Sequence, residues 1–243
     1  MKLGVLAISL IITASVACGG SSPTTPSAPT DPPTSVRGTW IDTPPTTIGT
    51  VESNPNGPNL IPFGGATTSN GVPFPGTTYQ QVYLGSLFGS NQVRLTDVEF
   101  FTHAQNGTRQ VVSANYTFSM STTTRAVDAL DQVNLASNVG PNQQVVFSGA
   151  LGAGAIVDSR FRVTFSSPFS FTPASGNLLL QVVRSNPGPN TSAAFLIHIA
   201  TDGFPTGLSS RASDFSNTQP GVHLVTRFYH QRCQCPTTDP CSC

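Results

Sequence analysis

The run from Leu178 to Val183 is the feature that most constrains what this chain can fold into. It consists of three leucines, a glutamine and two valines, and it is apolar on both faces of a strand. It follows residues 174–177, Ala-Ser-Gly-Asn, which are typical of a tight turn because Gly and Asn accept positive φ angles. A strand that is apolar on both faces needs cover on both, so we expect it in the middle of a sheet.

Further segments of strand length are spread along the chain, separated by turns rich in Gly and Pro. In Phe161 to Phe165, the clearest, Phe and Val alternate with Arg and Thr. A second alternation changes phase at Thr96-Asp97, which predicts a β-bulge, because one inserted residue keeps both halves facing the core. The other predicted strands are Val36 to Ile41, Tyr79 to Leu84, Val93 to Phe100, Asn115 to Met120, Gln144 to Ser148, Phe195 to Ile199 and Val222 to Tyr229.

These strands predict an all-β fold over residues 36–230, a single antiparallel β-sandwich with a jelly-roll-like arrangement. Only Thr124 to Leu135 has apolar residues at helical spacing, and we expect one short helix there. Residues 43–78 are rich in Pro and Gly, and we interpret them as a long ordered loop packed on the sandwich.

Residues 1–17 have the features of an export signal peptide. Lys2 precedes an apolar stretch from Leu3 to Ile12, and small residues follow up to Ala17. The apolar stretch is shorter than the roughly 20 residues that a membrane-spanning helix needs. Cys18 comes directly after the cleavage position and resembles the lipidated cysteine of bacterial lipoproteins, although Ser15 stands where that family usually has an aliphatic residue.

The resemblance implies lipidation of Cys18 and attachment to a membrane through that lipid. Residues 18–35 are rich in Pro, Ser and Thr and too poor in apolar residues to fold, so they predict a disordered tether. No aspartate follows Cys18, as in lipoproteins sorted to an outer membrane, and we expect an outer-membrane or cell-surface lipoprotein. The alternative is an ordinary secreted protein that is cut after Ala17.

Six short motifs are spaced along about residues 60–200: Ile61–Gly64, Tyr79–Tyr83, Ser121–Thr123, Ser137–Gly140, Val146–Gly149 and Pro168–Leu180. Together they resemble a β-sandwich domain of bacterial exported proteins, many of which carry a PEP-CTERM sorting tail. The resemblance implies an exported location and a β-sandwich, and it supplies no catalytic residues. The chain departs from that family because it has no Pro-Glu-Pro motif, no C-terminal apolar helix and no basic end.

Charged residues are scarce, at 9% against roughly 25% in an average globular protein, and the net charge is zero. We therefore expect no nucleic-acid partner. Asp97 and Glu99 share one face of a predicted strand at a separation of about 6–7 Å, which is close to that of glycosidase carboxyl pairs. The alternative is that both face solvent, because Val98 and Phe100 face the core.

Two other groups of polar residues each have two interpretations. Asp128, Asp131, Asn134 and Asn138 could supply oxygen ligands to calcium, or they are surface residues around a short helix. Trp40 is a sugar-stacking platform or, as we expect, part of the core or its cap. The chain has no P-loop, no GxGxxG and no Gly-x-Ser-x-Gly motif, so we expect no nucleotide cofactor and no serine nucleophile of that type.

Residues 231–243 form a cysteine-rich tail that contains Cys233, Cys235, Cys241 and Cys243. Four thiols so close together suit a soft metal, but the CxC spacing is tighter than the CxxC spacing of structural zinc sites. An exported protein meets an oxidising compartment, so we expect two disulfides and no metal. Cys18 makes the count odd, which fits its separate use as a lipid acceptor.

The sequence as a whole predicts a non-catalytic module of the cell envelope. Its partners would be a membrane, through the lipid on Cys18, and a polysaccharide or a surface protein, or its role would be structural. The alternative is a carbohydrate-active hydrolase that uses Asp97 and Glu99. We expect no cofactor in either case, and of the two we favour the module without enzymatic activity.

Overall fold

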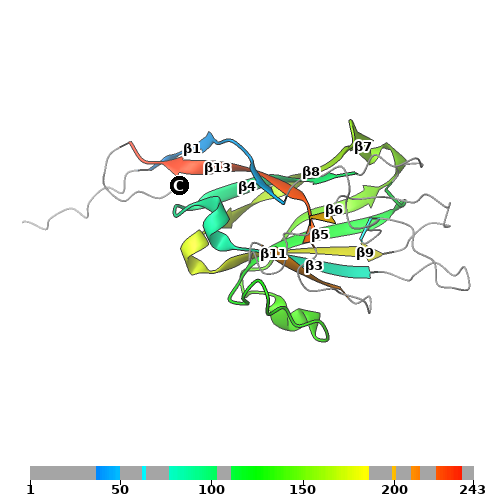
Figure 1. Ribbon diagram of the computed structural model, residues 1–243. Helices are drawn as coiled ribbons and strands as arrows, with labels where there is room; N and C mark the ends of the chain where they lie inside the picture. The colour runs from blue at the N-terminus through cyan, green and yellow to red at the C-terminus, as the bar shows by residue number, and fades with distance from the viewer. Residues whose placement is uncertain are drawn as a thin grey trace, which may run out of the picture. The chain divides into compact units, whose positions relative to one another are not determined.

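Two antiparallel sheets face each other across a shared core in the computed structural model (Figure 1). The structure describes residues 37–49, 62–63, 77–102, 111–185, 199–200, 209–213 and 223–236. Residues 35–243 belong to one compact unit. The predicted all-β sandwich is confirmed within the described ranges, where the helical turns are the short 3-10 segments η1 (Gly85–Phe88), η2 (Leu135–Asn138), η3 (Ala153–Ala155) and η4 (Pro173–Ser175).

We name each sheet after its central strand. The β4 sheet has the spatial order β1 (Thr39–Asp42), β13 (Thr226–Gln234), β4 (Val93–Phe101), β8 (Arg160–Phe171) and β7 (Ile156–Val157), and β2 (Thr46–Ile48) also pairs with β13. The β9 sheet has the order β11 (Ser209–Ser213), β3 (Thr77–Tyr83), β9 (Asn177–Ser185), β5 (Ala114–Thr123) and β6 (Gln144–Leu151).

The strand predicted to be central is central. β9 pairs with β3 on one side and with β5 on the other. Leu178 and Leu180 lie in the core between the sheets, whereas Leu179 belongs to a separate apolar cluster on the outer side of the β9 sheet. All three are at most 1% exposed, so the strand is apolar on both faces because both faces are covered. The predicted turn before it contains Gly176 at a φ of 144°, where a side chain would be strained.

Aromatic rings fill most of the core between the sheets. Phe63, from the segment predicted to pack on the sandwich as a loop, is fully buried and lies 4.9 Å, centroid to centroid, from both Phe100 and Phe161. Among the described residues, the eleven largest fully buried side chains are all Phe or Tyr, and burying each contributes roughly 1.5–3 kcal/mol.

The predicted bulge lies where the alternation changes phase. The register of β4 against β13 shifts at Thr96, because Tyr229 is opposite Asp97 while the next residue, His230, is opposite Leu95. The extra residue lets Leu95 and Val98 both reach the core. As a result, Asp97 and Glu99 face the outer side of the β4 sheet, together with the residues opposite them on β13 and β8.

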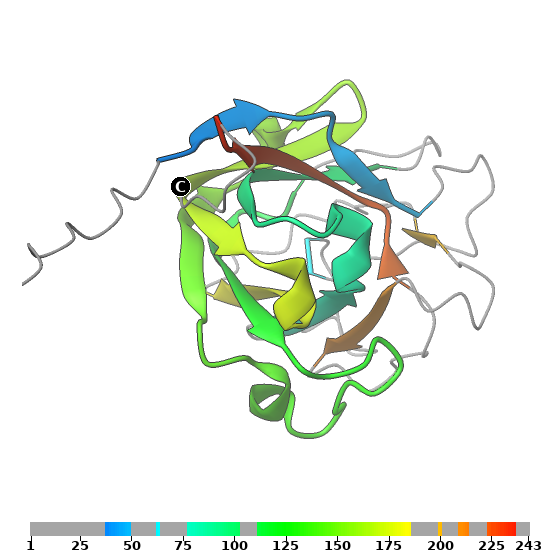
Figure 2. The same ribbon diagram turned by 90° about the vertical axis from the view of Figure 1, so that its left-hand side faces the viewer.

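The predicted helix at Thr124 to Leu135 is wrong. Residues 124–143 form a loop with the single 3-10 turn η2, and Figures 1 and 2 show this green segment outside the β9 sheet. Asn138 bonds both backbone groups of Asp131, with Asp131 N donating to Oδ1 and Nδ2 donating to Asp131 O. Such side-chain bonds to the backbone compete with helical hydrogen bonds, which explains why the apolar spacing did not produce a helix.

The last predicted strand, Val222 to Tyr229, is divided in two. β12 (His223–Leu224) pairs with β10 (Ile199–Ala200), and β13 begins at Thr226 and joins the β4 sheet. The side-chain amide of Gln81 holds β12 from the β9 sheet, because it donates to Leu224 O and accepts from Leu224 N, each at 3.0 Å. The Gln81 amide therefore pairs with both backbone groups of Leu224, as the backbone of a neighbouring strand would.

Candidate functional site

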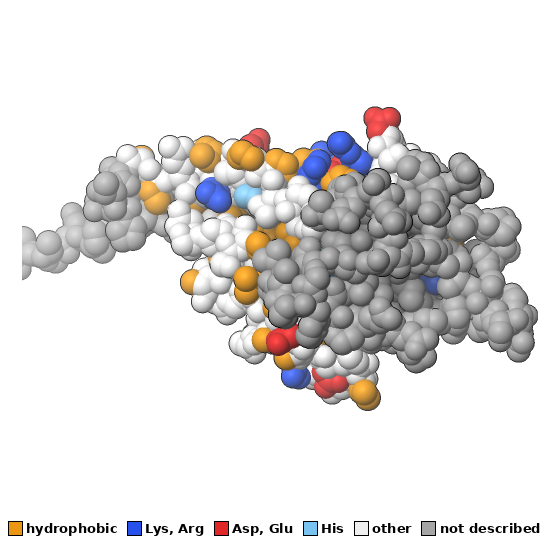
Figure 3. Space-filling view, in the orientation of Figure 1, with side chains coloured by type: hydrophobic (Ala, Val, Ile, Leu, Met, Phe, Trp, Pro, Cys, Tyr) orange, Lys and Arg blue, Asp and Glu red, His pale blue; other side chains and the backbone are white. Residues whose placement is uncertain are grey.

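Each sheet has an outer face with a group of buried or half-buried polar side chains, and these are the two candidate sites. Figure 3 shows how few charged side chains the described surface has in that view, in keeping with the composition. One candidate site, on the β4 sheet, is charged. The other, on the β9 sheet, is built from side-chain amides.

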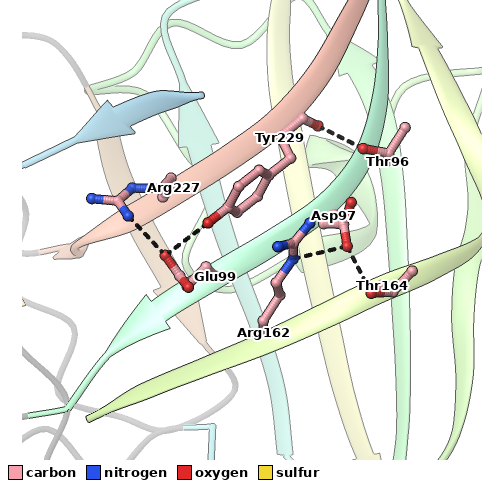
Figure 4. Close-up of polar contacts among 7 residues, drawn as sticks. All are labelled: Thr96, Asp97, Glu99, Arg162, Thr164, Arg227 and Tyr229. Atoms are coloured by element: carbon pink, nitrogen blue, oxygen red, sulfur yellow. Dashed lines mark hydrogen bonds and ion pairs between the residues drawn. The ribbon is translucent and has the colours of Figure 1, made fainter. Parts of the chain in front are cut away.

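Asp97 and Glu99 are the centre of the charged site (Figure 4). Arg162 Nε, from β8, donates to Asp97 Oδ1 at 3.0 Å, and Thr164 Oγ1 donates to the same oxygen at 2.7 Å. Arg227 Nη1, from β13, donates to Glu99 Oε2 at 3.2 Å. Each carboxylate is therefore in an ion pair with an arginine from a neighbouring strand.

Aromatic rings on the same outer face hold these arginines in place. The guanidinium carbon of Arg162 lies 3.7 Å from the centre of the Tyr229 ring, and that of Arg227 lies 4.9 Å from the centre of the Phe101 ring. At these distances the ring faces attract the cations. The arginine stems and the rings together cover the carboxylates.

The expectation that Asp97 and Glu99 face solvent is therefore only half right. They point away from the core, as the alternation with Val98 and Phe100 predicts, yet they are only 6% and 4% exposed. Burial by itself raises the pKa of the Asp97 carboxyl, but the hydrogen bonds from Arg162 and Thr164 outweigh it, and the pKa lies below its ordinary value. Asp97 is thus held ionised, whereas a general acid in a glycosidase needs a raised pKa.

The amide site lies on the outer face of the β9 sheet, under the loop 124–143. Asn138 Nδ2 donates to Gln80 Oε1 at 2.9 Å. Gln80 Nε2 donates in turn to Leu135 O at 2.9 Å and to Gln181 Oε1 at 2.7 Å. Asn138 and Gln80 are fully buried, and this relay of three amides satisfies their hydrogen-bonding groups.

The same loop is fixed to the sheet by apolar contacts and by one close backbone approach. Its residue Leu130 packs with Val82 and Leu179 in a small buried cluster on the outer face. At Gly140 a Cβ atom would lie only 1.7 Å from the carbonyl oxygen of Thr122 on β5. These contacts fix the position of the loop on the sheet without a ligand.

An open hollow of about 520 Å³ lies between this loop and the sheet. This volume is within the roughly 300–1,000 Å³ typical of small-molecule sites. The described residues that line it are uncharged, and they are Thr78, Leu135, Ala136, Val139, Gln143 and Gln181. Gln181 and Gln143 are not predicted from the sequence as site residues, because an isolated glutamine in a strand or a loop carries no sequence signal of a site.

The residues considered for calcium are used by the loop itself. Asp131 Oδ1 accepts from Val133 N at 2.9 Å and from Asn134 N at 2.8 Å, and Ser137 Oγ donates to Asp131 Oδ2 at 3.1 Å. The bonds from Asn134 N and Val133 N are the main reason that the pKa of Asp131 is lowered. Within the described ranges, no three His, Cys, Asp or Glu residues are grouped as a metal site would require.

The two histidines that the structure describes and Trp40 are buried or half-buried. His223 is fully buried. His230 is 3% exposed, with Thr43 Oγ1 2.7 Å from Nδ1 and Thr46 Oγ1 2.9 Å from Nε2. Trp40 is half-buried on β1, and the guanidinium carbon of Arg94 lies 6.0 Å from the ring centre, which fits the cap that we expected.

The cysteines are only partly within the described residues. β13 continues to Gln234, beyond the predicted start of the tail at residue 231, and Cys233 lies opposite Trp40 in its pairing with β1. Cys235 directly follows the strand, and Cys18, Cys241 and Cys243 are outside the described residues. The two disulfides and the lipidation of Cys18 therefore stay predictions, as does the export signal at residues 1–17.

Comparison with protein-family models, with curated proteins and with solved structures finds no match to this chain. Nor does the described part of the chain contain a helix of the length and apolarity that crossing a membrane requires. The fold and the two outer faces define a two-sheet, all-β protein with one charged and one uncharged polar face. Its function must be inferred from those faces.

Proposed function

We propose that this protein is a non-catalytic module of the cell envelope that binds polysaccharide. A lipid on Cys18 attaches it to a membrane, and residues 18–35 hold the sandwich away from that membrane. Its location is the outer membrane or the cell surface, and its cysteine-rich tail forms disulfides. The alternatives to polysaccharide binding for such a non-catalytic module are binding of a surface protein and a purely structural role.

The observation that carries this proposal is the uncharged hollow on the outer face of the β9 sheet. Side-chain amides and short apolar groups are suited to hydroxyl-rich ligands, because each hydroxyl both donates and accepts hydrogen bonds. The hollow is open, as a site for one unit of a long polymer has to be. A deep enclosed pocket would instead suit a free small molecule.

The second candidate is a carbohydrate-active hydrolase that uses Asp97 and Glu99. The observation in its favour is that the two carboxylates are neighbours on one outer face and are almost fully buried. Against it, each carboxylate is paired with an arginine, and the pKa of Asp97 is lowered. We place it second because catalysis would require at least one of the two pairs to open.

One experiment separates these two functions. The full chain is incubated with insoluble and soluble polysaccharides, and both the bound protein and the release of reducing ends are measured. Binding without release of reducing ends supports the module. Release that disappears in Glu99→Gln, a variant that keeps a hydrogen-bond acceptor for Arg227, would establish the hydrolase, and binding to no polysaccharide would overturn the proposal.

The attachment is tested by fractionating cells that express the wild type or Cys18→Ala. The variant should move from the membrane fraction to the soluble fraction, because no thiol is left at position 18 to be lipidated. Equal membrane association of both proteins would overturn the lipid anchor. Mass analysis of the unreduced protein counts the free thiols, and four free thiols in the tail with bound zinc or copper would overturn the disulfides.

A further inference from the structure

The hydrogen-bond relay fixes the orientation of Gln181 in the hollow. A backbone carbonyl only accepts, so the group of Gln80 that faces Leu135 O must be its amide nitrogen. The second hydrogen of that nitrogen is donated to Gln181, which must therefore present its oxygen to Gln80. The amide nitrogen of Gln181 is then directed away from the relay, and no described residue accepts a hydrogen bond from it.

Gln143 supplies a second polar group from the other wall of the hollow. Its Nε2 donates to Ser119 Oγ at 3.0 Å, and its oxygen has no partner among the described residues. The side chain is exposed at the end of the loop, whereas Gln181 is half-buried on the central strand. The hollow thus offers one hydrogen-bond donor and one acceptor that no other described residue uses.

The remaining described lining is mostly apolar. Leu135 and Val139 are half-buried and extend the cluster that holds the loop on the sheet. Ala136 is exposed beside them. These three side chains form an apolar wall next to the two amides, and no charged side chain is among the described lining residues.

We propose that this hollow is a subsite for one neutral sugar unit of a polysaccharide, which rests on the proposed binding function. The amide nitrogen of Gln181 donates to one hydroxyl, and the oxygen of Gln143 accepts from another. The C–H face of the sugar packs on Leu135 and Val139. A charged sugar would lose hydration in the hollow without gaining an ion pair, so the subsite selects against uronic acids.

An extended peptide is a poorer fit to the same hollow. Peptides bind to sheets most readily by adding a strand to an unpaired edge. β9 has β3 and β5 on its two sides, so its backbone groups are already paired where Gln181 projects. A ligand here has only side chains to bind, and a sugar unit meets that condition with its hydroxyls.

A single subsite of this kind is weak. No aromatic ring is among its described lining residues, and aromatic rings provide much of the contact area in tight sites. We expect a dissociation constant in the millimolar range for a short oligosaccharide. Many copies held on one membrane by lipid anchors would bind a long polymer more tightly, because each later contact is intramolecular.

The test is an NMR titration of the full chain with cellohexaose, maltohexaose and mannohexaose, and with trigalacturonate as the charged probe. Gln143→Leu, Gln181→Leu and Ala136→Leu should each weaken binding of the preferred neutral probe at least tenfold. Gln144→Leu is the matched control, because the amide of Gln144 bonds to Ser167 and Pro168 on β8 and not to the hollow. Its affinity should equal that of the wild type within twofold.

The outcomes separate this inference from the function on which it rests. Gln181→Leu removes an acceptor from buried Gln80 and should lower stability, so a melting curve accompanies it. The exposed positions Gln143 and Ala136 keep the test valid if that variant unfolds. Unchanged binding in those two variants overturns the subsite and leaves polysaccharide binding intact. Binding of trigalacturonate but of no neutral probe likewise overturns the neutral-sugar subsite and leaves polysaccharide binding intact. Binding of no oligosaccharide or polysaccharide overturns both.

Discussion

The outer faces of the two sheets bury polar side chains in different ways. On the β4 sheet, Asp97 and Arg162 belong to one ion pair and Glu99 and Arg227 to another, and each carboxylate satisfies its own partner. On the β9 sheet, a relay of amides runs from Asn138 through Gln80 to Gln181. A side-chain amide has both a hydrogen-bond donor and an acceptor. In this relay Gln181 uses its oxygen to accept from Gln80, so its amide nitrogen is left for a ligand.

This difference shows which buried polar groups are available for binding. A closed ion pair stabilises the fold locally and leaves few hydrogen-bonding groups for a ligand. This holds for Asp97 and Glu99, although they are the candidate catalytic residues. An open relay of neutral groups satisfies its buried members equally well, and it also holds its last member rigidly at the surface. Rigid donors bind ligands with a smaller loss of conformational entropy than mobile ones.

The largest expected effect comes from the central strand that supports the amide face. Leu180→Ala and Leu179→Ala should each lower the free energy of unfolding by about 2–5 kcal/mol, because each removes a buried side chain. Leu179 should be at the lower end, since the loop above it can partly collapse onto the smaller residue. Denaturant unfolding measures both, and a loss under about 0.5 kcal/mol for Leu179→Ala would show that the loop does not cover the strand.

The next effect tests the close approach of the loop. Gly140→Ala should lower the free energy of unfolding by about 1–3 kcal/mol, because its Cβ would overlap the carbonyl oxygen of Thr122. It should also weaken any ligand binding in the hollow. Gly154→Ala is the control, since no atom of the described residues beyond its chain neighbours lies within 4 Å of its Cβ position, and it should change stability by less than about 0.5 kcal/mol.

A smaller effect is expected on the charged face. Asp97→Ala should lower the free energy of unfolding by about 1–2 kcal/mol, because Thr164 and Arg162 lose their shared acceptor. The Arg162 side chain is 46% exposed and can be rehydrated, which limits the loss. A double-mutant cycle with Arg162→Ala isolates the pair, and ligand binding in the hollow should be unchanged.

The smallest effect is a pH dependence from His230. Its burial, with a further contribution from Arg232, lowers its pKa below the ordinary 6.5. The unfolded chain then takes up a proton at a higher pH than the folded chain does, so stability falls as the pH drops below about 6.5. Melting curves between pH 8 and pH 5 should show this decrease in the wild type. The decrease should be smaller in His230→Asn, and equal decreases in the two would contradict it.

Asp97 adds a second acid step in the same direction. Its pKa is lower in the folded chain than the ordinary 3.8, so its contribution is complete above about pH 4 and is lost as the pH falls through the folded value. The His230 step begins below about pH 6.5 and the Asp97 step below about pH 4. Asp97→Asn should reduce only the lower one, and His230→Asn should reduce only the upper one.

The sequence by itself determined the elements that depend on local periodicity. Leu178 to Val183 has apolar residues on both faces of a strand, so both faces had to be covered, and the phase change at Thr96 predicted a bulge. The alternation from Phe161 to Phe165 likewise placed Arg162 and Thr164 on the outer face of β8. In each case the side-chain pattern repeats over neighbouring residues, and neighbouring residues suffice to interpret it.

The tertiary structure alone decided the rest. Asp97 meets Arg162 across 65 positions of sequence, and Gln80 meets Asn138 across 58, so no local pattern marks either contact. The same holds for the loop 124–143, whose apolar spacing predicted a helix. The side-chain amide of Asn138 bonds to the backbone of Asp131. Leu130 packs against Leu179, which lies on a strand that comes later in the chain. The neighbours of a side chain on one face of a strand depend on which strands lie beside it in the sheet. That strand order is a property of the whole fold.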